Sequence, residues 1–128
     1  MLRINKKLNF ALNIAVILAF SDYPVSSRDL AKKLSIGIKS IEQIMLLLRR
    51  ENIVVANRGA LGGYRLFKDA NELMILEIMQ AVEGKNWAYV PSEDDANFLF
   101  WKDLKDQLET HLNQSLVAFC QYQEKKKA

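Results

Sequence analysis

Residues 26–51 decide the fold of this chain, and their sequence is SSRDLAKKLSIGIKSIEQIMLLLRRE. Ser26 precedes Asp29 at the spacing of a helix cap, so a short helix is predicted to begin at this point. A tight connection at residues 35–37 leads into a second helix, predicted over residues 39–51. Two short helices joined by about three residues form the helix-turn-helix pattern. The apolar residues predicted to line the inner faces of these helices are Leu30, Ala31, Leu34, Ile41, Ile44, Met45 and Leu48.

The segments on either side of this motif predict a winged helix. Apolar residues recur at helical spacing over residues 5–20, which predicts a first amphipathic helix. Residues 53–55 and 64–67 are rich in branched and aromatic side chains and are predicted to form two strands. Three glycines within residues 57–63 permit a tight hairpin tip between them. A helix, a helix-turn-helix and a two-stranded hairpin follow one another in winged-helix order.

Two further helices are predicted after the hairpin. Asn71-Glu72 has the composition of a helix cap, and Gly84 has that of a helix end. Ser92 begins a polar cap for a last helix that reaches about residue 122. A helix of roughly 28 residues is about 42 Å long, more than a small domain covers, so pairing with a second copy is predicted. The predicted dimerisation stripe consists of Trp101, Leu104, Leu108, Leu112, Leu116 and Phe119.

The predicted fold class is mainly α with a small β-hairpin. A winged helix-turn-helix DNA-binding domain is expected over residues 1–84, and a loop with a long C-terminal dimerisation helix over residues 85–128. With 128 residues, half of them hydrophobic, the chain is large enough for one such domain and one dimerising element.

Charge is distributed unevenly between the two halves of the chain. Residues 1–68 contain 12 Lys and Arg against 4 Asp and Glu, a net charge of +8, whereas residues 69–128 contain 6 against 11, a net charge of −5. A basic half is the electrostatic feature expected of a surface that meets phosphates. Solvated helices also carry such charge, so the asymmetry supports nucleic-acid binding only in combination with the fold.

The sequence also bears on localisation and cofactors. The longest apolar run, Ile14–Phe20, is too short to span a bilayer, and no signal-peptide cleavage site follows an apolar run, so a cytoplasmic protein is expected. Cys120 and His111 are the only cysteine and histidine. They are too few for a zinc site or for an iron–sulfur cluster held by several thiolates of one chain. No metal and no cofactor are therefore predicted.

The residues predicted to contact double-stranded DNA lie on three segments of the winged helix. The second helix of the motif enters the major groove, where Gln43 suits adenine, Lys39 suits guanine or phosphate, and Glu42 suits the cytosine amino group. Arg58 at the hairpin tip is placed to enter a minor groove, and the first helix of the motif begins where phosphates are contacted. The alternative for each is a solvated polar position, and the motif favours DNA contact for Gln43, Lys39 and Arg58. The predicted DNA-binding residues are Ser27, Arg28, Lys39, Ser40, Glu42, Gln43, Arg58 and Arg65.

Other functions are weighed against DNA binding. Trp87, Tyr89, Phe98 and Trp101 are candidates for a small-molecule pocket, although core and dimer packing explains them more simply. No nucleophile–base pair, metal set or phosphate loop is visible, so an enzyme is not predicted. The main alternative is a winged-helix module for protein–protein assembly without an operator of its own. Such a module does not need a basic surface.

Several motifs resemble the Rrf family of winged helix-turn-helix regulators. That family includes the iron–sulfur assembly regulator, the nitric-oxide-sensing repressor and the cysteine-metabolism repressor. The stretches that carry the similarity are Ser27-Arg28-Asp29-Leu30-Ala31, Ile41-Glu42-Gln43-Ile44, Arg58-Gly59 with Gly62-Gly63-Tyr64-Arg65-Leu66, Ala81-Val82-Glu83-Gly84 and Trp101-Lys102-Asp103-Leu104.

The resemblance implies a bacterial homodimeric transcriptional regulator, by family habit a repressor, that binds a partly palindromic operator. Members with an iron–sulfur cluster carry three cysteines between the helix that ends at Gly84 and the last helix. Residues 85–100 of this chain contain none, so the chain resembles the cluster-free branch. In the wing, Ala60-Leu61 stands where the family usually has Pro-Gly. The effector is left open between a small molecule and a partner protein.

Overall fold

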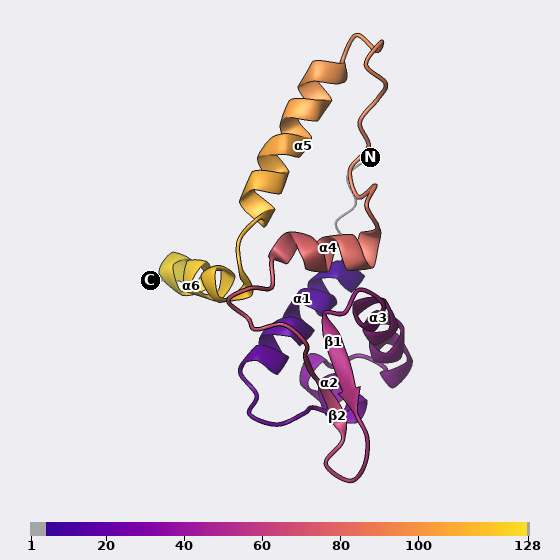
Figure 1. Cartoon of the computed structure of the whole chain (residues 1–128), viewed down its shortest axis with the longest axis vertical. Coiled ribbons are helices and arrows are strands. Elements are labelled where there is room, and N and C mark those ends of the chain that lie inside the picture. The colour runs from indigo at the N-terminus through magenta and orange to yellow at the C-terminus, as the bar shows by residue number, and fades with distance from the viewer. Residues whose placement is uncertain (1–4, 128) are drawn as a thin grey trace.

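The structure, a computed structural model, describes residues 5–127 and is mainly helical with one β-hairpin (Figure 1). The predicted fold class, a winged helix-turn-helix that is mainly α, is confirmed. Residues 1–4 and residue 128, the outer ends of the two predicted segments, lie outside the described residues. The elements are α1 (Lys6–Ala19), α2 (Ser27–Leu34), α3 (Ile38–Arg50), β1 (Val54–Asn57), β2 (Gly63–Leu66), α4 (Ile75–Glu83), α5 (Phe98–Leu112) and α6 (Leu116–Lys127).

The helix-turn-helix forms as its sequence predicts. The Ser26 hydroxyl accepts a hydrogen bond from the Asp29 backbone N–H at 3.1 Å and caps α2. Ser35 ends α2 in the left-handed conformation, with φ of 55°, at a position where glycine is common. The Ile36 backbone N–H then donates to the Ala31 carbonyl at 3.1 Å, which turns the chain into α3. The serine therefore makes the same turn that a glycine makes, at a modest conformational cost.

The hairpin is fastened to the segment that precedes α2. Its strands pair antiparallel, with Val54 opposite Leu66 at one end. The backbone of Tyr64 also exchanges two hydrogen bonds with Val25, of 2.9 and 2.8 Å. Gly63 permits this close approach, because its φ is +146° and a Cβ there would lie 2.6 Å from the Val25 carbonyl carbon. The base of the wing is therefore fixed relative to the helix-turn-helix.

Two groups of buried side chains hold the elements together. The larger core joins α1, α2, α3, β1, the segment before α4, α4 and the start of α6. A smaller cluster consists of Leu8, Met79 and Trp87. The residues of the larger core with 0% exposure are Ala11, Ile14, Ala15, Leu30, Ile41, Met45, Leu48, Leu73 and Leu116.

The C-terminal region differs from the prediction, because the single long helix expected up to residue 122 is two helices. The chain leaves α5 at Asn113, and the Ser115 hydroxyl accepts from the Ala118 backbone N–H at 3.0 Å at the start of α6. The break is held by the segment before α4. The Leu116 N–H donates to the Leu73 carbonyl at 2.8 Å, and the Ile75 N–H donates to the Gln114 carbonyl at 2.9 Å. With 15 residues, α5 is about 22 Å long, roughly half the expected length.

Two helix starts also lie later than predicted. Asn71 does not cap α4, because residues 69–73 form a turn and Met74 is extended in a bridge with Ser115. Ser92 does not cap α5 either, since residues 92–97 form successive turns and Asn97 is the residue before the helix. The predicted end of α4 at Gly84 is confirmed, with φ of 85°.

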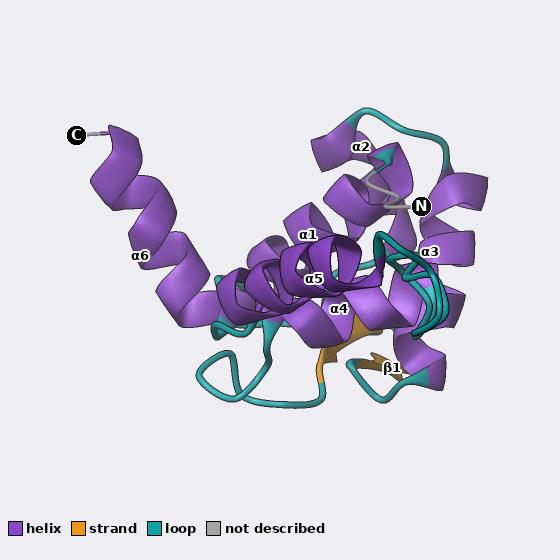
Figure 2. Cartoon of the chain, turned by 90° about the horizontal axis from the view of Figure 1, so that it is seen from above, coloured by secondary structure: helices purple, strands orange, loops and turns teal. Residues whose placement is uncertain are grey.

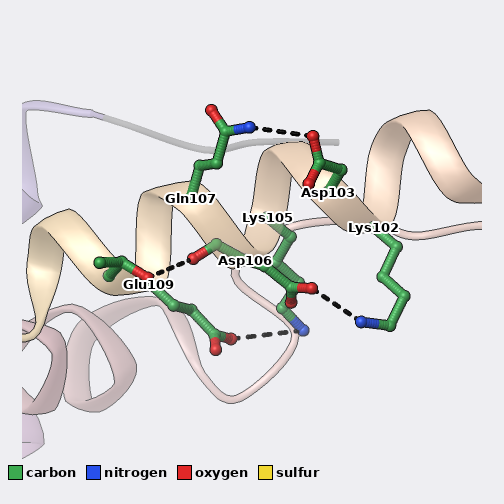
Figure 3. Close-up of polar contacts among 7 residues, drawn as sticks. Lys102, Asp103, Lys105, Asp106, Gln107 and Glu109 are labelled. Carbon is green, nitrogen blue, oxygen red and sulfur yellow. Dashed lines mark hydrogen bonds and ion pairs between the residues drawn. The ribbon is translucent and has the colours of Figure 1, made fainter.

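Helix α5 projects from the domain, and only its later part packs against it, through Leu108 and Leu112. It extends away from the end of the molecule that carries the hairpin (Figure 1), and α6 leaves the domain in another direction (Figure 2). None of its residues is buried. Polar side chains of α5 pair with one another along the helix. Lys102 pairs with Asp106 at 2.7 Å, and Gln107 donates to Asp103 at 2.9 Å (Figure 3). No helix within residues 5–127 combines the length and apolarity that a membrane crossing requires.

Candidate DNA-binding surface

The outward side of α3 carries four of the predicted DNA-binding residues. Lys39, Ser40, Glu42 and Gln43 are all exposed. The opposite side of the helix is buried in the core through Ile41, Ile44, Met45 and Leu48, and this burial fixes which side chains face solvent. Residues three and four apart are neighbours on a helix, so the four polar side chains form one continuous patch. The patch has the position and chemistry of the base-reading face of a recognition helix.

The wing presents two predicted residues. Arg58 is exposed in the tip between β1 and β2, and Leu61 beside it is 88% exposed. The tip closes through a 2.9 Å hydrogen bond from the Gly62 N–H to the Gly59 carbonyl, so Ala60-Leu61 supports a tight turn without the Pro-Gly of the family. Arg65 is exposed on β2, and its guanidinium donates at 3.4 Å to the adjacent Leu66 carbonyl.

The start of α2 supplies the remaining two predicted residues. Arg28 is exposed, and Ser27 is half-buried in the first turn of the helix. Because Ser26 satisfies the Asp29 N–H, Ser27 is not needed as the cap of this helix. The first turn of α2 presents backbone N–H groups and the positive end of the helix dipole, a combination that favours contact with a phosphate.

One contact between these segments is absent from the predictions. The Tyr64 hydroxyl of the wing donates to Glu42 Oε2 of α3 at 3.4 Å. The structure thus brings the wing and the outward side of α3 together at a pair of residues 22 positions apart in sequence. No periodicity or cap connects such distant residues, so sequence patterns had no means of identifying the pair.

The predicted dimerisation stripe is divided between α5 and the domain. Trp101 and Leu104 are 43% and 39% exposed. Leu108 and Leu112 are half-buried, because both pack against the cluster around Trp87. Phe119 packs partly against the main core. Leu116 is fully buried within its own chain and is corrected to a core residue, since a buried side chain is not available to a partner.

The N-terminal end of α5 adds apolar surface that the predicted stripe does not include. Phe100 is 66% exposed and lies one turn before Leu104 on the same side of the helix. Its ring packs edge-on against Trp101, with 5.0 Å between ring centres. Three neighbouring large apolar side chains on one helix are therefore without a covering element among the described residues.

Two of the aromatic side chains weighed as lining a small-molecule pocket lie in different environments. Trp87 is 1% exposed and packs in the smaller core cluster, with the Lys105 ammonium 5.9 Å from its ring centre. Tyr89 is 64% exposed. Trp87 therefore has the packing role predicted from the sequence as the simpler explanation.

Comparison with known proteins defines first a class and then a family. The chain is structurally similar to CymR, the global cysteine regulator of B. subtilis, with a TM-score of 0.83 over 95% of this chain and 98% of that one, at 26% identity. It has the fold of T. potens IscR, with a TM-score of 0.81 over 99% of this chain and 92% of that one, at 23% identity. Both similarities show the winged-helix fold, and the similarity to CymR places the chain in the class of winged-helix transcriptional regulators.

Sequence comparison identifies the family. The model of the Rrf2 family, described as an iron-dependent transcriptional regulator, matches residues 4–120. The HTH-type transcriptional regulator IscR of Cronobacter sakazakii is 28% identical over 123 residues, which is 88% of this chain and 75% of that protein. The chain belongs to the Rrf2 family, and the resemblance seen in its motifs is confirmed.

The family description raises the question of an iron centre in this chain. Cys120, the single cysteine, is half-buried on α6 and not in the loop between α4 and α5. Burial raises the pKa of its thiol, and the charge of Glu124 raises the pKa further. A raised pKa disfavours the thiolate, which is the form that binds metal. Within residues 5–127 no three His, Cys, Asp or Glu side chains gather as metal ligands. The residues present do not fit an iron–sulfur cluster.

Proposed function

We propose that this protein is a homodimeric, sequence-specific DNA-binding regulator, a repressor of transcription in the bacterial cytoplasm that binds a partly palindromic operator. The observation that carries the proposal is the exposed polar patch on α3, in a domain that also exposes Arg58 on the wing and Arg28 on α2. The basic charge of residues 1–68 supports it, since phosphate contacts supply much of the affinity for DNA.

Each segment has a distinct role on the duplex in this proposal. Helix α3 enters the major groove, where Gln43 pairs with adenine and Lys39 with guanine or a phosphate. Ser40 and Glu42 complete the contacts of this helix. Arg58 enters the flanking minor groove. Phosphate contacts from Ser27, Arg28 and Arg65 fix the orientation of the domain without reading sequence.

We propose that α5 forms the dimer interface, as the second functional segment beside the DNA-binding domain. Trp101, Leu104 and Phe100 are exposed on α5, and Leu104 lies on the opposite side of the helix from the Lys102–Asp106 pair. Pairing with the same surface of a second copy removes this apolar area from water. A two-fold dimer presents two α3 helices, which matches the two half-sites of a palindromic operator.

We further propose that DNA binding by this chain does not depend on an iron–sulfur cluster, since a single cysteine of raised pKa is a poor ligand set. The effector of the proposed regulator is a small molecule or a partner protein.

The first test is selection of genomic DNA fragments by the purified protein at two salt concentrations. Enrichment of a dyad-symmetric sequence that survives the higher salt is the expected result. Salt-sensitive binding with no enriched sequence indicates only phosphate attraction. That result contradicts the proposal and favours the alternative, a winged-helix module for protein–protein assembly.

A pair of variants locates the reading surface. Replacing Gln43 with alanine is expected to cost about 1–3 kcal/mol of binding and to relax the preference at one base pair. Gln107→Ala, at an exposed position of α5, is the matched control and leaves the selected sequence unchanged. If the Gln43→Ala protein selects the same sequence with the same affinity, Gln43 is not part of the surface that reads the bases.

A further inference from the structure

The hydrogen bond between Tyr64 and Glu42 joins the wing to the outward side of α3. Within residues 5–127 it is the only side-chain hydrogen bond between the hairpin and this helix. The donor and acceptor oxygens are 3.4 Å apart, which is long for an O–H···O bond. Its effect on overall stability is therefore small, and its significance depends on what Glu42 does.

Glu42 is the only acidic residue of α3. A carboxylate at a DNA surface is repelled by phosphates and by bases that present only acceptors. It is favourable only where the facing base offers an amino group into the major groove, as cytosine does with N4 and adenine with N6. An acid at this position therefore penalises sequences without that donor, which is specificity by rejection.

Rejection requires that the carboxylate be held in place. A free glutamate side chain rotates about several bonds and turns away from an unfavourable base. Tyr64 is a suitable anchor, because its backbone is bonded to Val25 on one side and paired with Ala56 of β1 on the other. Its ring is half-buried and packs on the main core. The hydroxyl therefore has a fixed position relative to α3.

We propose that Tyr64 is a positioning residue for sequence recognition, whose hydroxyl holds the Glu42 carboxylate toward the base edge that it tests. This inference rests on the proposed DNA-binding function and adds a residue of the wing to the determinants of sequence preference. The preference at one base pair then also depends on the position of the wing relative to α3, because the wing carries the Tyr64 hydroxyl that donates the hydrogen bond.

A purely structural role for Tyr64 predicts a different result from a positioning role. Loss of ring packing weakens binding to all sequences by a similar factor. Loss of positioning changes the ratio of affinities between the best sequence and its single-base variants. Tyr64→Phe removes the hydroxyl and keeps the ring, so the core contacts of the side chain are retained.

The test measures binding of the best selected duplex and of each of its single-base variants. Tyr64→Phe is expected to lower discrimination at one base pair by about two- to tenfold, the effect of one hydrogen bond, and to leave the other positions unchanged. In a Glu42→Ala background, Tyr64→Phe is expected to have no further effect, because no carboxylate remains to be held. Tyr89→Phe, at an exposed tyrosine in the loop before α5, is the matched control.

Three outcomes overturn the inference. One is a Tyr64→Phe protein with the discrimination of the wild type at every position. Another is a uniform loss of affinity for all duplexes. The third is a Tyr64→Phe effect that persists in full without Glu42. Failure of the wild-type protein to select any sequence removes the proposed function itself, and the inference with it.

Discussion

The winged-helix domain and α5 differ in how much of their apolar side chains is exposed. In the domain, Ile14, Ile41 and Leu48 have no exposed surface. In α5 no residue is buried, and Phe100 and Trp101 are 66% and 43% exposed. The domain therefore buries its large hydrophobic residues within one chain, whereas α5 keeps large apolar side chains exposed among the described residues. This difference supports the proposal that α5 pairs with a second copy of the chain.

The largest effect is expected in the core of the domain. Leu48→Ala removes a fully buried side chain and is expected to lower the free energy of unfolding by about 2–5 kcal/mol, because a cavity remains. Leu61→Ala, at the 88% exposed wing tip, is the matched control, with an expected change within about 0.5 kcal/mol. Urea unfolding at one protein concentration measures both, and equal losses contradict the assignment of the core.

The second effect concerns the apolar side of α5. Leu104→Asp places a charge in the proposed dimer interface and is expected to raise the dimer dissociation constant by about two orders of magnitude, measured by sedimentation. Leu99→Asp is the control, because Leu99 lies on the polar side with Asp103 and Asp106. Leu104 is a sharper choice than Leu108, which also packs on the Trp87 cluster. If the Leu104→Asp protein stays dimeric, the dimer interface lies elsewhere on the protein.

A third effect lies where the wing joins α4. Glu77 accepts hydrogen bonds from Lys68 Nζ and, at 2.9 Å, from the Met74 N–H. Partial burial raises the pKa of Glu77, but these hydrogen bonds and the Lys68 charge outweigh it, so the pKa lies below its ordinary value.

The lowered pKa sets the pH dependence. The ionised form is favoured in the folded state, so its stabilisation is present above pH 4.5 and is lost as the pH falls through the lowered pKa. Glu77→Gln is expected to cost about 0.5–1 kcal/mol at pH 7, since both partners are partly solvated, and less in acid. Glu83→Gln on the same helix is the control. A difference that grows as the pH falls contradicts this sign.

The smallest effect is expected on the polar side of α5. Lys102 and Asp106 form an exposed pair at 2.7 Å, with side chains 51% and 54% exposed. Solvent and salt screen such pairs, so Lys102→Ala is expected to leave the unfolding midpoint unchanged in physiological salt. Leu104→Ala on the opposite side is the comparison in the same assay. A marked loss from Lys102→Ala indicates that the polar side also meets a partner.

Sequence patterns predicted the domain well because local chemistry specifies it. Apolar periodicity and the Ser26 cap locate the helix-turn-helix, and Gly63 marks the turn into the second strand. The predicted DNA contacts on α3 and at the wing tip are exposed in the structure, although only experiment tests their role. The Tyr64–Glu42 contact was not predictable, because it joins residues 22 positions apart through the tertiary fold.

The C-terminal region shows what local patterns miss. An apolar stripe from Trp101 to Phe119 keeps helical spacing through the break, so periodicity predicts one helix. The only local signal is Asn113-Gln114-Ser115, which combines residues typical of a helix end and a new cap. That signal is weak beside a continuous stripe.

The sequence by itself determined the winged helix, the side of α3 that faces solvent and the family, because caps, turns and apolar spacing act over a few residues. Only the tertiary structure decided that the last helix breaks, that Leu116 belongs to the core and that Glu42 meets Tyr64. The physical reason is the same in each case. Hydrogen bonds from residues 114–116 to residues 73–75, and burial of Leu116, stabilise a broken helix over the continuous one that local propensity favours.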